Sequence, residues 1–207
     1  MKRKTMMVSL IRCGQTVWDA DGRLRGSTDL PLSDAGRVAV QADLSQSALG
    51  RPSLIHHPPD DAATETARLC AARMGAKIKS ADGLADPNLG LLEGLTRQEF
   101  AERFHTRFKQ WDEDPLSLSP PEGEDVVDAA DRLFNTVARI LKRSRSDEVA
   151  LVLHDMGIGL MRCWLSDRPL TEMRAVLKDR PRIERYAVPT SLLSALEGAA
   201  STAHVRS

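Results

Sequence analysis

Three short apolar runs, each followed by polar residues, constrain the fold of this chain more than any other feature. They lie at Met6–Ile11, Ser53–His57 and Val149–Leu153, and runs of this kind are typical of strands buried on both faces of a sheet. Because helical patterns separate these strands, we expect a mostly parallel sheet in a three-layer α/β/α fold. Weaker strand patterns lie around Ile78 and at Leu192–Leu196.

Four of the segments between the strands repeat apolar residues at helical spacing, which predicts that each helix buries one face. The stripes are Val38, Ala42 and Leu49 after an N-cap at Ser33; Ala63, Ala67, Cys70 and Met74; Phe100, Phe104, Phe108 and Trp111; and Val126, Ala130, Leu133, Val137 and Leu141. A further helix is expected at Ile158–Leu165. We interpret the aromatic stripe as core and the mixed-charge segment 179–185 (DRPRIER) as surface.

Length and charge limit the classes of function. The 207 residues predict one domain over 1–207 with a peripheral tail from Gly198. With 29 basic and 29 acidic residues, the chain has no overall attraction to nucleic acid or to an anionic membrane. The apolar run near the N-terminus is too short for a signal peptide or a membrane span. The odd number of cysteines favours a reducing cytoplasm, and we expect no cofactor and leave a homodimer open.

Polar residues that can do chemistry follow the predicted strands. Arg12 and Cys13 follow the first strand, His56 and His57 end the second, and His154 follows the strand at 149–153. In open α/β sheets, ligands bind outside the carboxyl ends of the strands. The sequence therefore predicts a ligand site at this edge.

Five segments around these strand ends, in the same order, resemble the histidine phosphatase superfamily, also called phosphoglycerate mutase-like. They are RCGQT (12–16), HPPDDAATETA (57–67), DPNLGLLEG (86–94), PPEGED (120–125) and LVLHD (151–155). The resemblance extends from about Val8 to Leu165 and implies the same fold.

The resemblance also implies roles for individual residues. In the family, a histidine after the first strand takes the phosphoryl group, two arginines and a second histidine hold its oxygens, and a carboxylic acid protonates the leaving oxygen. Here the catalytic set implied is Arg12, Cys13, Asp86 and His154, with cysteine in the nucleophile position, while the second arginine is Ala62. The substrate-binding positions implied are Thr16, Asp19, Arg25, Gly26, His57 and Asp155.

These replacements lower the positive charge of the predicted pocket. A pair of unit charges at 4 Å in an effective dielectric near 20 is worth about 4 kcal/mol, so an exchange of attraction for repulsion weakens binding of a phosphate dianion by orders of magnitude. Arg25 restores one positive charge. We therefore predict a pseudoenzyme with a degenerate phosphate pocket, impaired or inactive in catalysis and used for binding or regulation, whose partner is a phosphorylated small molecule or anion.

Two alternatives remain open. One is an active phosphatase, a hydrolase of a small phosphorylated metabolite, in which Cys13, His57 or Arg25 compensates for the losses. Hydrolysis is favoured over a mutase reaction, which requires exclusion of water from the phosphoenzyme. The other is a zinc site formed by Cys13, His154, Asp86 and either His56 or His57, although no ligand pair has zinc-site spacing and we predict no metal.

Overall fold

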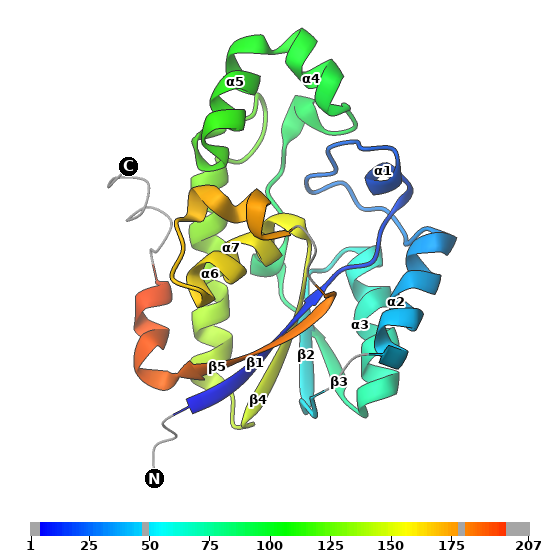
Figure 1. The fold of residues 1–207 in the computed structure, drawn as a ribbon, viewed down its shortest axis with the longest axis vertical. Helices are drawn as coiled ribbons and strands as arrows, with labels where there is room; N and C mark the ends of the chain where they lie inside the picture. Colours follow the sequence, from blue (N-terminus) through cyan, green and yellow to red (C-terminus); the bar gives the residue numbers. More distant parts are fainter. Residues whose placement is uncertain (1–4, 47–49, 178–180, 198–207) are drawn as a thin grey trace.

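A five-stranded sheet forms the centre of the molecule (Figure 1). The computed structural model describes residues 5–46, 50–177 and 181–197. The strands are β1 (Thr5–Arg12), β2 (Leu54–His57), β3 (Lys77–Ser80), β4 (Glu148–Leu153) and β5 (Ile183–Pro189), in the order β3-β2-β4-β1-β5. The first four pair in parallel, and β5 is antiparallel to β1. The mostly parallel sheet predicted from the apolar runs is confirmed.

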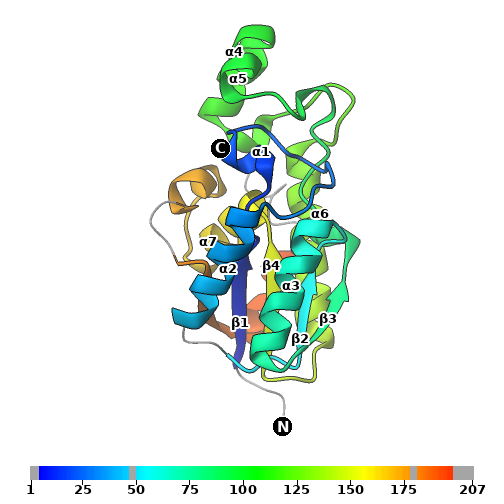
Figure 2. The same ribbon diagram turned by 90° about the vertical axis from the view of Figure 1, so that its right-hand side faces the viewer.

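Helices cover both faces of this sheet. Figure 2 shows α2 (Asp34–Gln46) and α3 (Asp61–Met74) in front of the sheet, and α6 (Val126–Arg143) and α7 (Asp155–Leu165) lie on the opposite face. Two clusters of buried apolar side chains, one on each face, hold the layers together. The expected three-layer fold is confirmed. Among the described residues, no helix is both long enough and apolar enough to cross a membrane.

The C-terminal part of the sheet differs from the prediction. The strand expected at Leu192–Leu196 is wrong, because this segment belongs to the 3₁₀ helix η5 (Thr190–Leu196). The last strand is β5, whose first three residues belong to the segment 179–185, interpreted from its sequence as charged surface. Its Ile183 and Val188 are buried, whereas its charged side chains pair with other elements, as Arg185 does with Glu148. An edge strand tolerates such charges, so a mixture of positive and negative residues does not by itself exclude a strand.

The buried face of α2 also differs from the predicted one. Val38 is 65% exposed, whereas Val40 and Leu44 are buried; Leu49 lies outside the described residues. The expected N-cap is confirmed, since Ser33 Oγ accepts a hydrogen bond from the backbone N of Gly36 at 3.0 Å. The helix therefore starts where predicted but buries a neighbouring stripe.

The aromatic stripe forms two short helices, α4 (Arg97–Arg103) and α5 (His105–Glu113), which meet at Phe104. Phe100 is fully buried, and its ring centroid lies 5.4 Å from Phe108 and 5.3 Å from Trp111. The interpretation of the stripe as core is confirmed. In Figure 1 these helices rise above the upper end of the sheet, where the parallel strands end.

Shorter elements complete the fold around that end. They are α1 (Val17–Ala20), η1 (Asp82–Leu84), η2 (Gly90–Leu92), η3 (Pro115–Ser117) and η4 (Leu170–Leu177). Of these elements, α1, η3 and η4 contribute residues near the carboxyl ends of β1 and β4.

Candidate functional site

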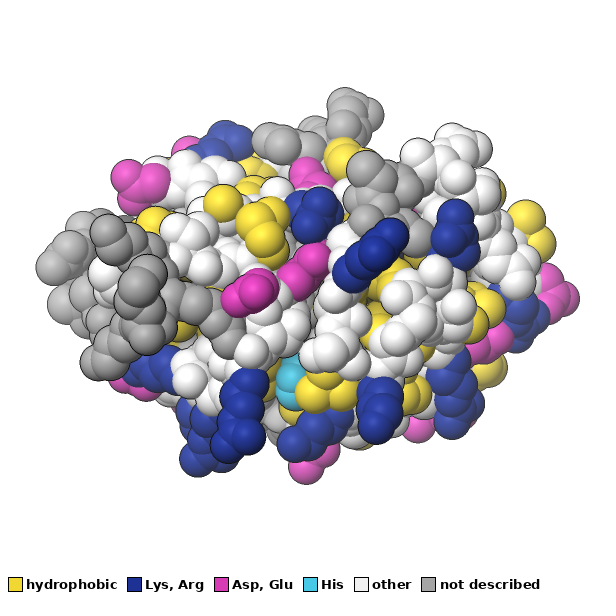
Figure 3. Space-filling model, turned by 90° about the horizontal axis from the view of Figure 1, so that it is seen from below, with side chains coloured by type: hydrophobic (Ala, Val, Ile, Leu, Met, Phe, Trp, Pro, Cys, Tyr) yellow, Lys and Arg dark blue, Asp and Glu magenta, His cyan; other side chains and the backbone are white. Residues whose placement is uncertain are grey.

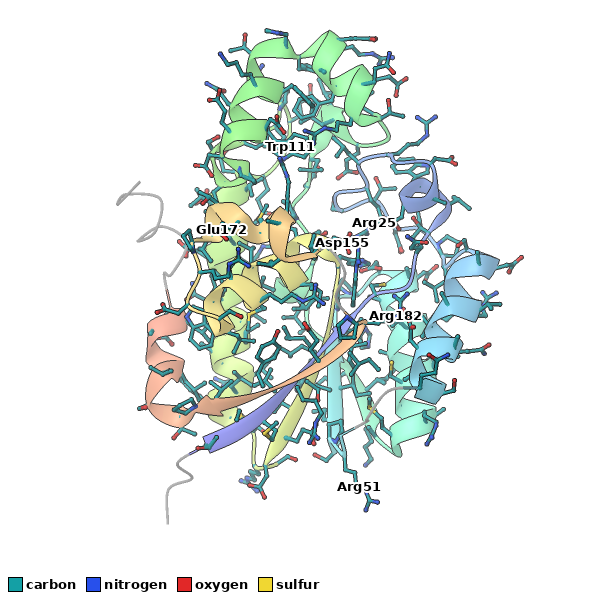
Figure 4. The ribbon with its side chains drawn as sticks, viewed as in Figure 1. Arg25, Arg51, Trp111, Asp155, Glu172 and Arg182 are labelled. Carbon is teal, nitrogen blue, oxygen red and sulfur yellow. The ribbon has the colours of Figure 1, made fainter. Side chains whose placement is uncertain are left out.

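A cavity of about 490 Å³ opens at the carboxyl ends of β1 and β4. Eight of the ten residues predicted for the site line it, namely Arg12, Cys13, Asp19, Arg25, Gly26, Asp86, His154 and Asp155. Figure 4 shows Arg25, Asp155 and Arg182 around this end of the sheet, with Trp111 above them. We call this space the first cavity.

The other two predicted residues do not line the first cavity. Thr16 is fully buried and caps α1, and its side-chain hydroxyl donates to Asp19 Oδ2 at 2.8 Å. It therefore positions Asp19. His57 is buried beside α3, where its Nδ1 lies 2.6 Å from the carbonyl oxygen of Pro58 and 3.4 Å from Thr64 Oγ1. In this structure His57 faces the protein interior and not the first cavity.

Cys13 lies at the floor of the first cavity on a loop that is tied to α3. The Cys13 Sγ atom is 3.5 Å from Thr66 Oγ1, which also accepts a hydrogen bond from the backbone N of Gly14 at 3.1 Å. The Cys13 backbone N donates to the carbonyl of Leu153 at 2.8 Å, which continues the pairing of β1 with β4. These contacts fix the sulfur next to the end of β4, where His154 follows.

His154 forms a buried pair with Asp60. Its Nε2 atom lies 2.9 Å from Asp60 Oδ2, and Asp60 in turn caps α3 by accepting from the backbone N of Ala63 at 3.0 Å. Burial lowers the pKa of His154, but the Cys13 sulfur and Asp60 outweigh it and raise the pKa well above its usual value. Burial raises the pKa of Asp60, yet the hydrogen bond with His154 holds it below its usual value. Both shifts favour an imidazolium paired with a carboxylate.

Arg12 and Arg25 also face carboxylates. Arg12 forms a bidentate pair with Asp155, with Nε–Oδ1 and Nη2–Oδ2 distances of 2.5 and 2.6 Å. Arg25 is 7% exposed, and its Nη2 lies 3.6 Å from Asp86 Oδ2. Burial raises the pKa of Asp86 although His154 and Arg25 lower it. A buried carboxyl with a raised pKa suits a group that donates a proton.

Sequence reasoning gave no site role to three arginines that line this cavity, Arg23, Arg174 and Arg182. Arg23 lies 3.6 Å from Glu99. The guanidinium of Arg182 donates to the carbonyl of Cys13 at 2.8 Å and lies 2.6 Å from Asp43.

Arg174 lies over the ring of Trp111, 3.7 Å from its centroid, and pairs with Asp112 at 3.5 Å. Trp111, which the sequence pattern predicts only as core, therefore also lines the cavity. No motif marks Arg174 and Arg182, because both come from the C-terminal segment beyond the recognisable patterns.

Apolar side chains also line the first cavity. They include Leu89, Leu118, Val126, Met156, Met173 and Leu177. A ligand would thus meet apolar as well as charged side chains.

The zinc alternative finds no support. In residues 5–46, 50–177 and 181–197, no group of three or more His, Cys, Asp or Glu side chains is arranged to hold a metal ion. His57 points away from the first cavity, and His56 lines a different one.

Comparison with known proteins agrees with the fold. The model of the histidine phosphatase superfamily (branch 1) matches residues 8–183. Phosphoglycerate mutase-like protein 4 of Arabidopsis thaliana is 27% identical over 71% of this chain, and the match spans 65% of that relative. Phosphoserine phosphatase 1 of Hydrogenobacter thermophilus is 26% identical over 75% of this chain and 74% of its own.

Solved structures give the same result. A mycobacterial glucosyl-3-phosphoglycerate phosphatase in complex with VO3 superposes with a TM-score of 0.72 at 26% identity, over 82% of this chain and 86% of its own. The structure titled mycobacterial hydrolase 2 has a TM-score of 0.73 at 22% identity and covers 94% of this chain and 99% of its own. The second likeness concerns the fold alone.

Proposed function

Because this chain belongs to the histidine phosphatase superfamily (branch 1), we propose that it keeps the family's phosphate pocket as a binding site and has lost phosphoryl transfer. The ligand is a small phosphorylated molecule or anion. Cys13 occupies the position that the family's nucleophilic histidine takes, and Ala62 that of its second arginine. The pocket serves binding or regulation.

The observation that carries this proposal is the pairing with a carboxylate of every arginine that the structure describes in the first cavity. Five described arginines line it, and each has a carboxylate oxygen within 4.0 Å. The pairs are Arg12–Asp155, Arg23–Glu99, Arg25–Asp86, Arg174–Asp112 and Arg182–Asp43. His154 is paired with Asp60 in the same way. The charges of these pairs sum to zero, so they give the cavity no net positive charge to attract a phosphate dianion.

The energetic consequence is large for a doubly charged ligand. A carboxylate about 4 Å from a phosphate charge opposes binding by about 4 kcal/mol in an effective dielectric near 20. At about 1.4 kcal/mol per factor of ten, one such contact already lowers affinity by orders of magnitude. Phosphoryl transfer demands still more positive charge than binding does, because charge spreads over the phosphoryl oxygens in the transition state.

Turnover of p-nitrophenyl phosphate tests the proposal. We expect the purified chain to hydrolyse it no faster than Cys13→Ser and His154→Ala variants do. If phosphoryl transfer has been lost, neither the Cys13 nor the His154 side chain contributes to catalysis. Titration with inorganic phosphate, followed by the ring signals of His154 in NMR spectra, should show weak binding in the same cavity. Turnover that disappears in both variants would overturn the proposal.

A second candidate function is an active phosphomonoesterase, and one observation favours it. Asp86 is buried with a raised pKa, as a proton donor to a leaving oxygen requires. In this reaction the Cys13 thiolate forms a bond to phosphorus as the ester P–O bond breaks. Asp86 gives its proton to the leaving oxygen, and water then hydrolyses the thiophosphate. If this candidate holds, an Asp86→Asn variant slows esters with poor leaving groups far more than aryl phosphates.

We also propose that the protein works in the cytoplasm. Cys13, Cys70 and Cys163 are all free and buried, which supports a reducing compartment.

A further inference from the structure

A second cavity, of about 570 Å³, lies between α6 and the edge of the sheet formed by β2 and β3. It shares no lining residue with the first cavity. Its walls come from the last turns of α6, the two strands, η1 and the loop that leads into β4. Figure 3 views the molecule from below, where Lys and Arg side chains gather along one side of this end and a histidine shows among them.

The second cavity is lined by four basic side chains, Lys79, Arg139, Arg143 and Arg145. Over the described residues, no ion pair joins Lys79 or Arg143 to a carboxylate. Arg139 donates to the Thr136 hydroxyl of its own helix at 2.9 Å. These cations come from α6, from β3 and from the loop before β4, so they face the cavity from different sides.

Carboxylates do not balance this charge. Asp82 and Glu148 also line the second cavity, but Glu148 is engaged elsewhere. It accepts from Ser9 Oγ at 2.7 Å and pairs with Arg185 at 3.1 Å. The charges of Lys79 and Arg143 are therefore not compensated by a carboxylate among the described residues, and Glu148 is already neutralised by Arg185.

His56 also lines the second cavity and carries a buried polar atom without a partner in the segments that the structure describes. It is only 9% exposed, and its Nδ1 atom is buried with no hydrogen-bond partner among the described residues. In β2 it pairs in register with Lys79 of β3, so both side chains face α6. Burial, with Lys79 and His57, lowers the pKa of His56 to about 4. A buried polar atom without a partner is rare in native proteins and calls for one.

We propose that the second cavity binds a small polyanion with two or more phosphate or carboxylate groups. The cations stand on separate elements, so a single anionic group does not engage all of them, whereas a polyanion does. The volume falls within the range of about 300–1,000 Å³ that is usual for small-molecule sites. The hydroxyls of Ser53 and Ser80 also line the cavity and can donate to anionic oxygens. The chain as a whole is neutral, which disfavours nucleic acid as the occupant.

Binding of inorganic tripolyphosphate to the full chain tests this proposal. We expect calorimetry at low ionic strength to show one site, and NMR spectra to show that the His56 ring signals move while those of His154 do not. Lys79→Gln and Arg143→Gln should each weaken binding by about fivefold or more, because each removes one unit charge at the site.

Matched controls are available on the same kinds of element. Lys77 lies on β3 with Lys79, and Arg73 stands in the last turn of α3 as Arg143 does in α6. Neither lines the second cavity, so Lys77→Gln and Arg73→Gln should change the affinity by less than about twofold. Equal weakening in all four variants would show general charge attraction and overturn the proposal. It is also overturned if the His56 signals stay still, if Arg12→Gln abolishes binding, or if a single-stranded oligonucleotide binds while tripolyphosphate does not.

Discussion

The two cavities both contain several arginines but differ in what those arginines contact. In the first cavity every arginine of the described segments has a carboxylate partner, and His154 is paired with Asp60. In the second, Lys79 and Arg143 have none in the described part of the chain. The difference teaches that the number of basic side chains in a cavity does not predict its potential. Partners decide how much of each charge a ligand meets.

In the first cavity, the fold and the ability to bind phosphate depend on different residues. The parallel strands of the family deliver Cys13 and His154 to one edge of the sheet, as the fold requires. Whether that edge binds a phosphate depends on single carboxylates such as Asp155 and Asp60, which the fold does not require. Substitutions that remove or add a single charge should therefore change ligand binding and leave the fold unchanged.

The largest expected effect comes from removal of a carboxylate in the first cavity. Asp155→Asn frees Arg12 and should raise the affinity for inorganic phosphate about 10- to 100-fold. A fully buried charge pair would give a larger effect, but this pair is partly exposed to solvent, which weakens it. Asp155 is 56% exposed and is the first residue of α7. Asp34, the first residue of α2, is a matched control. Calorimetry should show this gain in affinity for Asp155→Asn and none for Asp34→Asn. Equal affinities of the two variants for phosphate would mean that the carboxylate partner of Arg12 does not weaken binding in the first cavity.

The next effect concerns the pair of His154 and Asp60. Since the pKa of His154 is raised in the folded chain, the stability that the pair contributes is fully present below the unfolded pKa of about 6.5 and is lost as pH rises through the folded pKa. Asp60→Asn keeps the α3 cap and should lower the free energy of unfolding by about 1–2 kcal/mol near pH 6.

Urea denaturation at a series of pH values measures this effect. The variant and the parent should converge as pH rises above the folded pKa of His154. A constant difference between them across the whole pH range would mean that His154 is not charged in the folded protein.

The smallest expected effect comes from adding a carboxylate to the second cavity. Ser53→Asp gives this cavity a carboxylate of the kind the first cavity has, and it should weaken tripolyphosphate binding by about fivefold, near 1 kcal/mol, since Ser53 is exposed to water. Ser53→Ala controls for loss of the hydroxyl. If Asp and Ala variants bind equally well, charge at this position does not govern the cavity.

Sequence patterns were sufficient for the parallel part of the sheet and for most of the first cavity. The runs ending at Arg12 and His154 are continuous and apolar, and parallel pairing brings their ends together. Patterns failed at β5, because its two buried apolar residues, Ile183 and Val188, lie five positions apart and pack on opposite faces of the sheet. They therefore form no alternating pattern of apolar residues.

The partners of the charged groups could not be predicted. Asp60 precedes a helix in the sequence and is a natural N-cap, but its contact with His154 spans 94 positions along the chain. The same holds for Arg182, which directly precedes β5 and reaches the carbonyl of Cys13. Such contacts depend on side-chain placement in three dimensions, and local periodicity carries no information about it.

The central claim is that the charge-paired first cavity does not transfer a phosphoryl group to Cys13. Intact-mass spectrometry after incubation with p-nitrophenyl phosphate, quenched at short times, tests it most directly. We predict that the full chain keeps its unmodified mass at every time point. A population heavier by one phosphoryl group, present in the parent chain and absent from Cys13→Ser, would contradict the account.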